Sequence, residues 1–319
     1  MPLPARAGAA GPGAPGGGGP GAVRARPLRV LYIDPDGEQW DWSDLAGPVQ
    51  VTNVAGHGSP PVSLTTLGMP SGASLPQNYV GSGRTILVGI VAGADTQTEF
   101  LRLSDRLAQA LWTERLGEPA PGTLVIQRPD GTGRRIKVMV TDGPDLSDDD
   151  RDKSGLTWTS FVITFKSLDA CWSDATPTTL TFQGADSGAG VPPMPPVVLS
   201  PYAVLGDTTV NNTGNAAAYP VWKISGPGTP TLENVTLGRS FGLATALSEG
   251  ETVTIDTAPD GSAYAIDQDG EDRWTDLVKS SPRDLWELVK GPNHLNLALS
   301  GSSSASRIEL SYVRRWLRA

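Results

Sequence analysis

The alternation of apolar and polar residues predicts β-strands along most of the chain, and one segment departs from it. Between residues 96 and 116, apolar side chains recur every three or four positions, which indicates an amphipathic α-helix at about 100° per residue. One arc consists of Phe100, Leu103, Leu107, Ala110 and Leu111. The opposite arc consists of Arg102, Asp105, Arg106 and Gln109. We predict a single packing helix whose apolar side lies on a sheet.

Both ends of this helix carry signals. Thr96 and Glu99 have the spacing of a capping box, in which a hydroxyl and a carboxylate satisfy amides of the first turn. Gly117 is placed to end the helix, because glycine adopts the left-handed conformation common after the last turn. We therefore expect the helix to span residues 96–116.

Around the helix, alternating segments predict strands joined by turns. Ile136, Val138 and Val140 would share one face of a strand, and Pro129-Asp130-Gly131 would form the turn before it. Residues 47–83 are rich in Gly and Pro breakers, so we expect a long loop that binds something or reaches a neighbour. The strands predicted in this half are 28–33, 40–42, 84–91, 122–128, 134–141, 158–166 and 180–182.

The second half shows short strands at roughly ten-residue spacing, which is typical of a β-sandwich. A proline run at residues 191–198 cannot pair in a sheet and predicts a stiff linker. We therefore predict a flexible Gly/Pro-rich extension at 1–27, a β domain with the helix at 28–190, and a sandwich domain at 199–319. The sandwich strands are predicted at 203–211, 221–225, 234–237, 240–243, 252–256, 263–266, 294–299 and 307–312.

Composition and charge narrow the functional class. The chain of 319 residues has 38 Gly, 28 Pro and 18% charged residues, which favours strands and turns over helices. A net charge of −9 argues against a binder of duplex DNA or of anionic membranes, because such binding needs a basic surface. A single cysteine, Cys171, excludes an intrachain disulfide. With no membrane-length apolar run and no secretory signal, we expect synthesis in a cytoplasm.

The sequence gives no positive sign of catalysis or of a bound metal. It lacks the P-loop and H-E-x-x-H patterns. Its one G-x-S-x-G match, Gly238 to Gly242, overlaps the strand predicted at 240–243 and is not followed by a predicted helix, and His57 beside Ser59 is not by itself a triad. Residues 267–272 look like a calcium loop, but their glycine falls at the fourth position instead of the sixth, so we predict a hairpin turn there. We expect a non-enzymatic protein without cofactors.

The order of several segments carries a resemblance to a known family. The strand at Arg84, the helix and residues 161–172 resemble the ring-forming domain of the distal tail proteins of long-tailed bacteriophages (siphoviruses). Residues 212–226, 250–257, 291–295 and 314–317 resemble the galectin-like sandwich of that family. Taken together, the chain resembles a distal tail protein over most of residues 28–319.

The resemblance implies a structural virion protein. It implies a homohexameric ring at the distal end of the tail, joining the tail tube to the tip or baseplate hub and leaving a channel for DNA. The fold implied is mainly β: a barrel-like or split-barrel N-terminal domain with one packing helix, followed by a galectin-like sandwich. The implied partners are the chain itself, the tube protein, the hub and other minor tail proteins, with genomic DNA passing unbound and no membrane involved.

Three groups of residues are candidate sites. Arg102 and Arg106 could contact a neighbouring subunit. Trp274 could stack on a glycan, which would suit the alternative function of a carbohydrate- or receptor-binding tail accessory module. A ring encoded by a bacterial chromosome, as part of a phage-derived particle, is a further alternative. An acidic loop could face the channel and repel DNA, and its carboxylates are Asp145, Asp148, Asp149, Asp150 and Asp152.

Overall fold

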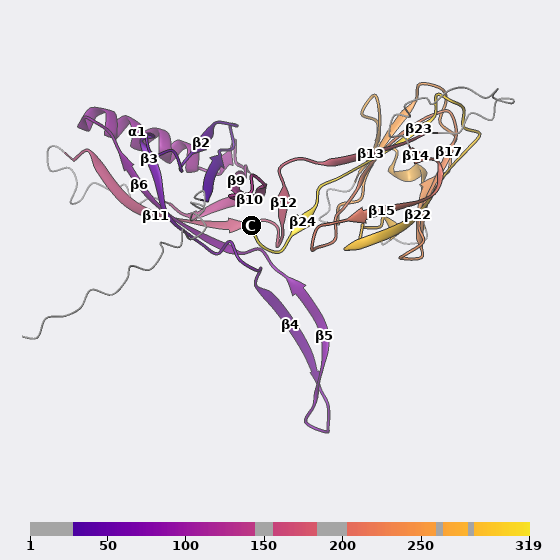
Figure 1. Ribbon diagram of the computed structural model, residues 1–319, viewed down its shortest axis with the longest axis horizontal. Helices are drawn as coiled ribbons and strands as arrows, with labels where there is room; N and C mark the ends of the chain where they lie inside the picture. The colour runs from indigo at the N-terminus through magenta and orange to yellow at the C-terminus, as the bar shows by residue number, and fades with distance from the viewer. Residues whose placement is uncertain (1–27, 144–155, 184–202, 260–263, 280–283) are drawn as a thin grey trace, which may run out of the picture.

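The computed structural model describes residues 28–143, 156–183, 203–259, 264–279 and 284–319. In that part of the chain two β-rich bodies lie side by side, and a long hairpin projects from the first (Figure 1). The predicted extension at 1–27, the predicted linker at 191–198 and the acidic loop at 145–152 lie outside the described residues. The mainly β fold with a helix packed on a sheet is confirmed.

The first body is built on one nine-stranded sheet. Its main path runs β2-β1-β9-β10-β11-β6-β3 with antiparallel neighbours, so the sheet is open and β2 and β3 are its edges. Two further strands, β12 (Trp172–Asp174) and β24 (Arg315–Trp316), extend it from β10. The strands of the path are β1 (Arg29–Ile33), β2 (Gln39–Asp41), β3 (Val49–Ala55), β6 (Thr85–Gly93), β9 (Gly122–Gln127), β10 (Gly133–Asp142) and β11 (Trp158–Ser167).

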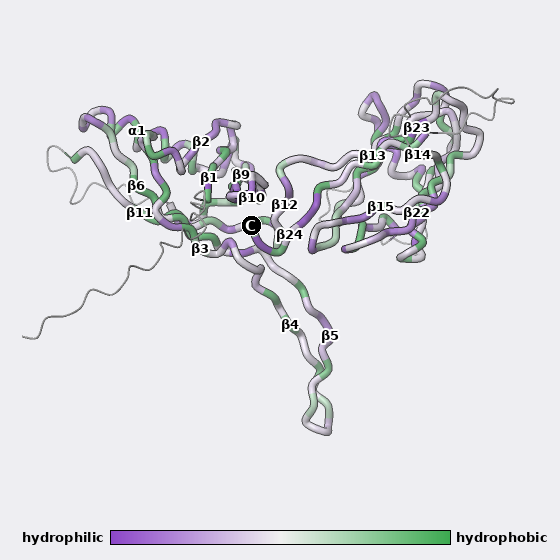
Figure 2. The backbone as a smooth tube through the Cα atoms, viewed as in Figure 1, coloured by the Kyte–Doolittle hydropathy of each residue, from purple (hydrophilic) through white to green (hydrophobic). Residues whose placement is uncertain are grey.

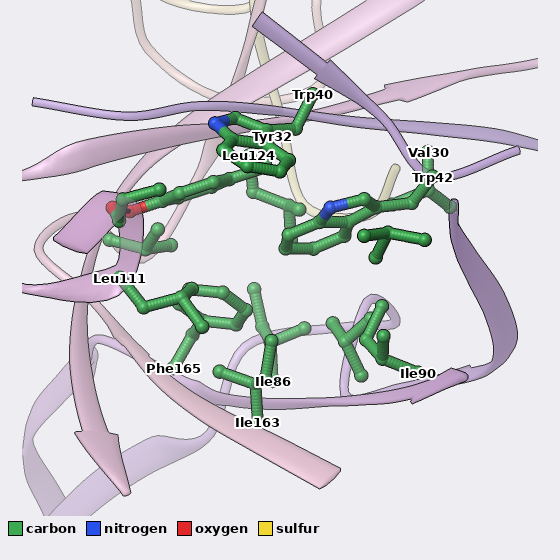
Figure 3. Packing of buried hydrophobic residues seen from close by; sticks show 14 of the residues in the cluster. Val30, Tyr32, Trp40, Trp42, Ile86, Ile90, Leu111, Leu124, Ile163 and Phe165 are labelled. Atoms are coloured by element: carbon green, nitrogen blue, oxygen red, sulfur yellow. Dashed lines mark hydrogen bonds between the residues drawn. The ribbon is translucent and has the colours of Figure 1, made fainter. Parts of the chain in front are cut away.

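Helix α1 (Gln97–Leu111) covers one face of this sheet. All five residues of the predicted apolar arc are buried, and the four polar ones opposite are exposed. Beneath them Tyr32 stacks on Trp42 with ring centroids 5.2 Å apart, and Phe165 lies 5.5 Å from Tyr32 (Figure 3). Thr96 is the N-cap, since its hydroxyl accepts a 3.3 Å hydrogen bond from the Glu99 amide. The helix is therefore a packing element, as its periodicity predicts.

The helix ends earlier than the sequence suggested. Its C-cap is Trp112, because the buried Thr113 turns inward and its hydroxyl accepts a 3.3 Å hydrogen bond from the Val140 amide. Strands β7 (Glu114–Arg115) and β8 (Glu118–Pro119) follow as a small hairpin. Leu116 and Gly117 form its turn with φ of 54° and 86°, so Gly117 serves that turn and does not end the helix.

Residues 47–83 are not a loop. They contain β3 and then a hairpin of β4 (Val62–Gly68) and β5 (Ser74–Gly81), which pair with each other and with no other described strand. The prediction failed because Pro60, Pro61, Pro70 and the glycines mark the hairpin's base and tip, while the strands between them lack a buried face. The expectation that the segment reaches a neighbour stays a prediction.

The second body is a sandwich of two sheets with a core between them. Trp222 and Trp286 pack edge to face in that core with ring centroids 5.2 Å apart. One sheet has the order β14 (Ala203–Val204), β13 (Thr178–Gln183), β23 (Arg307–Tyr312), β16 (Val221–Ser225), β19 (Thr252–Asp256), β20 (Ala265–Asp267). The other has the order β15 (Gly206–Asn212), β22 (Gly291–Ser300), β17 (Thr229–Asn234), β18 (Arg239–Leu243), β21 (Leu277–Val278).

Two details of the sandwich differ from the sequence prediction. The strand expected at 234–237 is the turn between β17 and β18, in which Leu237 N donates to Asn234 O at 3.1 Å. The strand itself, β17, lies just before it and contains Pro230, a residue type that is rare in strand interiors. In addition, β13 pairs with β23 although it precedes the predicted linker. The change from one sheet system to the other therefore falls between β12 and β13, and the predicted domain boundaries stay a prediction.

Candidate assembly surface

The β4–β5 hairpin is the most exposed part of the described fold. Every residue from 61 to 82 is exposed to solvent, and the hairpin stands away from both bodies (Figure 1). Its large apolar side chains are bare as well: Leu64 is 57% exposed and Tyr79 is 70% exposed. A two-stranded hairpin is marginally stable alone, so an isolated arm of this length needs a surface to rest on.

The hairpin also lacks charge. No Asp, Glu, Lys or Arg occurs from Leu45 to Gly83, although 18% of the chain is charged. Figure 2 shows hydrophobic positions along both strands of the hairpin. Exposed strands are normally protected from association by charged side chains, Lys above all. Their absence here makes the hairpin a candidate surface for contact with another protein chain. This uncharged stretch was visible in the sequence and could have pointed to the arm.

A β-bulge between Thr65 and Thr66 divides the hairpin into two parts. Near the base, Leu64 lies opposite Tyr79, with Val62 on the same face because side chains two positions apart share a face. Beyond the bulge, Leu67 lies opposite Leu75, and this pair belongs to the other face. The hairpin therefore carries a basal apolar patch (Val62, Leu64, Tyr79) and a distal apolar patch (Leu67, Leu75) on opposite sides.

The polar face of helix α1 is the second candidate surface. Arg106 donates to Glu38 at 2.6 Å, and its guanidinium lies 5.3 Å from the centre of the Trp40 ring. Arg106 is thus engaged within its own chain. Arg102 makes no described hydrogen bond or ion pair and lines a surface groove of about 830 Å³ together with the 59% exposed Trp158. The structure separates the two arginines that the sequence had grouped.

The ring of Trp274 is not free on both faces to stack on a sugar. It lies at the start of a short 3₁₀ helix (Trp274–Asp276) and packs partly against the sandwich core. Lys279 Nζ lies 3.4 Å from the centre of its ring, so one face already has a cation–π partner. The other two large tryptophans of this body, Trp222 and Trp286, are buried. The glycan role of Trp274 stays a prediction.

The calcium-like segment forms a turn. Asp267 accepts hydrogen bonds at its Oδ1 from the amides of Asp269 and Glu271, at 3.0 and 2.9 Å, and Gly270 N donates to Asp267 O. No group of three metal-ligating side chains occurs in the part of the chain that the structure describes. Among the described helices, none is long and apolar enough to cross a membrane.

Known proteins resemble the chain in sequence over one part and in fold over nearly all of it. Residues 213–316 match the family model of the siphovirus-type tail component, C-terminal domain. Residues 213–316 therefore carry the C-terminal domain of a siphovirus-type tail component. The resemblance to the distal tail protein family is confirmed, and the protein is a structural part of a phage tail. No curated protein sequence matches the chain.

Solved structures extend the likeness of this tail component to both bodies. The SPP1 Dit (gp 19.1) protein, described as a paradigm of the hub adsorption apparatus in phages that infect Gram-positive bacteria, has 12% identity and a TM-score of 0.60. The match covers 91% of this chain and 99% of that one. A chain of the phage P2 baseplate, in its activated conformation with Ca, has 11% identity and a TM-score of 0.51, covering 91% and 98%. At such identities the match shows a shared fold.

Proposed function

We propose that this tail component forms a closed homohexameric ring at the distal end of a long phage tail. The ring joins the tail tube on one side to the tip or baseplate hub on the other and leaves a passage for DNA. Its action is geometric and needs no catalysis or cofactor. The likeness to SPP1 Dit and to the P2 baseplate supports this place in the tail, and the number six comes from the resemblance to distal tail proteins.

The observation that carries the proposal is the uncharged projecting hairpin. An arm that leaves its own body and rests on a different surface of the next copy makes a heterologous contact, and such contacts generate rings when the rotation closes. Burying the basal and distal patches would offset the cost of ordering the arm. The hairpin therefore supplies the contact that a ring requires, without adding a charged interface.

The charge of the chain suits a passage that DNA crosses without binding. A protein with a net charge of −9 has little capacity to release counterions from phosphates. We also propose that the acidic loop faces the channel. Its carboxylates, which lie outside the described residues, are Asp145, Asp148, Asp149, Asp150 and Asp152. A ring structure with these carboxylates directed away from the axis would remove this part of the proposal.

Mass measurement tests the ring directly. Native mass spectrometry of the wild-type chain, alone and with its tube protein, is expected to show six copies, whereas Leu64→Asp in the basal patch should shift the mass to the monomer. Leu45→Asp makes the same substitution at a leucine that is 84% exposed and lies outside the hairpin, and serves as the matched control. Persistent wild-type monomers in both conditions, or intact hexamers of Leu64→Asp, would refute the proposal.

A further inference from the structure

Residues 314–319, here called the return strap, leave the sandwich and come back to the large sheet. Within it, β24 pairs with β12, with Trp316 opposite Trp172 and Arg315 opposite Ser173. Figure 1 places the end of the chain on the first body, far along the sequence from the strands it touches. The strap therefore belongs to both bodies.

On the sandwich side the strap is held by hydrogen bonds to the side chain and the main chain around Asn215. The Asn215 side chain accepts from Leu317 N at 2.7 Å, and Arg315 O accepts from the amides of Asn215 and Ala216 at 3.0 and 3.2 Å. The Arg315 guanidinium also lies 4.9 Å from the centre of the Tyr219 ring. A change in the position of this turn would act on the strap directly.

On the sheet side the strap is held by arginines. Arg315 Nη2 donates to both carboxylate oxygens of Asp169, at 2.5 and 2.6 Å. The buried Arg134 donates to Arg318 O, and its guanidinium lies 4.0 Å from the centre of a Trp316 ring. Arg128 Nη2 donates to Ala319 O at 2.9 Å. These bonds fix the strap against the same sheet from which the hairpin projects.

The base of the hairpin is tied to the strap through one buried side chain. Arg84 is 1% exposed, and its guanidinium donates to the carbonyls of Gly58, Ala170 and Leu317. Burial lowers the pKa of Arg84. Ala319 N donates to His57 O at 3.1 Å as well. Because a buried donor that loses its acceptor keeps its desolvation cost, loosening the strap at Leu317 would weaken the hold on Gly58.

We propose that the return strap couples the position of the sandwich to the stability of the hairpin base. The path runs from the Asn215 turn through Arg315 and Leu317 to Arg84, and from there to residues 57–58. The coupling is a property of a single chain and does not need the ring. The role of this coupling rests on the proposed function. A partner that binds the sandwich would change the stability of the hairpin through which neighbouring copies contact each other.

Hydrogen exchange on the full chain, at a concentration where it is monomeric, tests the coupling. Asn215→Ala removes the acceptor for Leu317 N, and Arg315→Gln removes the ion pair with Asp169. Arg315 lines the same cavity as Pro60 and Gly81 of the hairpin base, so Asn215→Ala is the variant that tests the coupling from a distance. We expect amides of residues 56–59, 62 and 79–84 to exchange on the order of tenfold faster in each variant. Amides at the centre of the β6–β11 pairing should be unaffected.

Arg239→Gln is the matched control. It breaks the 3.2 Å contact of Arg239 with Glu287 inside the sandwich and touches no strap residue. Its hairpin base should exchange as in the wild type. Unchanged exchange at residues 56–59 and 62 in both strap variants would overturn the proposal, as would an equal acceleration in the control or throughout β6 and β11. Because the measurement uses monomers, its failure is distinguishable from failure of the ring.

Discussion

Arg106 on the polar face of the helix is bound to Glu38 of its own chain, with Nη2 and Oε1 2.6 Å apart. The two side chains are 60% and 52% exposed, so the pair contributes a few tenths of a kcal/mol to stability at most. Because Arg106 has a partner within its own chain, Arg102 is the arginine that we expect to contact another subunit in the proposed ring. Substitutions of the two arginines are therefore expected to have different effects.

Arg102→Glu should weaken the ring and leave the monomer as stable as the wild type, because Arg102 has no described partner to lose. Arg106→Glu should lower monomer stability by less than about 1 kcal/mol, since it breaks the Glu38 pair and the contact with Trp40. Native mass spectra and chemical denaturation, run on both variants, separate the effects. Intact hexamers of Arg102→Glu would mean that the helix braces its own domain and nothing more.

Thr96→Ala should destabilise the first body by about 1 kcal/mol, because the N-cap hydroxyl accepts from the Glu99 amide. Thr98→Ala is the control: Thr98 lies exposed in the first turn and should lose nothing, since alanine favours the helix. Chemical denaturation followed by circular dichroism measures both. Equal stability of Thr96→Ala and the wild type would count against the cap.

Trp286→Ala should cost the sandwich about 3–5 kcal/mol. The side chain is fully buried, packs edge to face on Trp222 and donates its indole N–H to Leu232 O at 3.2 Å. Trp158→Ala removes an equally large ring that is 59% exposed and should change monomer stability by no more than about 0.5 kcal/mol. Fluorescence-detected denaturation compares the two, and similar losses would contradict the assignment of the core.

The sandwich should lose stability as the pH falls. Its Glu251 carboxylate accepts from Ser248 N at 2.9 Å and pairs with Arg273, and these contacts hold the pKa of Glu251 below its usual range. A lowered folded-state pKa gives stability that is full above the ordinary pKa, about 4.3, and is lost as the pH falls through the folded value. Glu251→Gln should flatten thermal stability measured between pH 6 and 3; an unchanged slope would oppose this.

Sequence periodicity predicted the elements in which buried residues recur at a regular spacing. The helix residues Phe100, Leu103 and Leu107 repeat with a clear period, and Ile163 and Phe165 alternate along a strand; all five are buried. It failed where local signals compete. Thr113 ends the helix through a tertiary contact with β10, which no pattern within the helix reveals.

The candidate site was less predictable than the fold. The hairpin has no buried face, so its strands show no alternation between interior and solvent, and its prolines and glycines suggest a loop. Arg102 and Arg106 are equivalent on a helical wheel and differ only because Glu38 and Trp40 come near Arg106 from a separate strand region. Such distinctions depend on long-range packing, which a single sequence does not encode locally.

The absence of charge along the β4–β5 hairpin determines how contacts made through it depend on salt and temperature. Salt screens attraction between ions, whereas contacts between apolar side chains strengthen in salting-out solutions and weaken in the cold. In the proposed ring, copies joined through such arms would stay together at low and at high salt alike. Low temperature, not ionic strength, would be the condition that separates them.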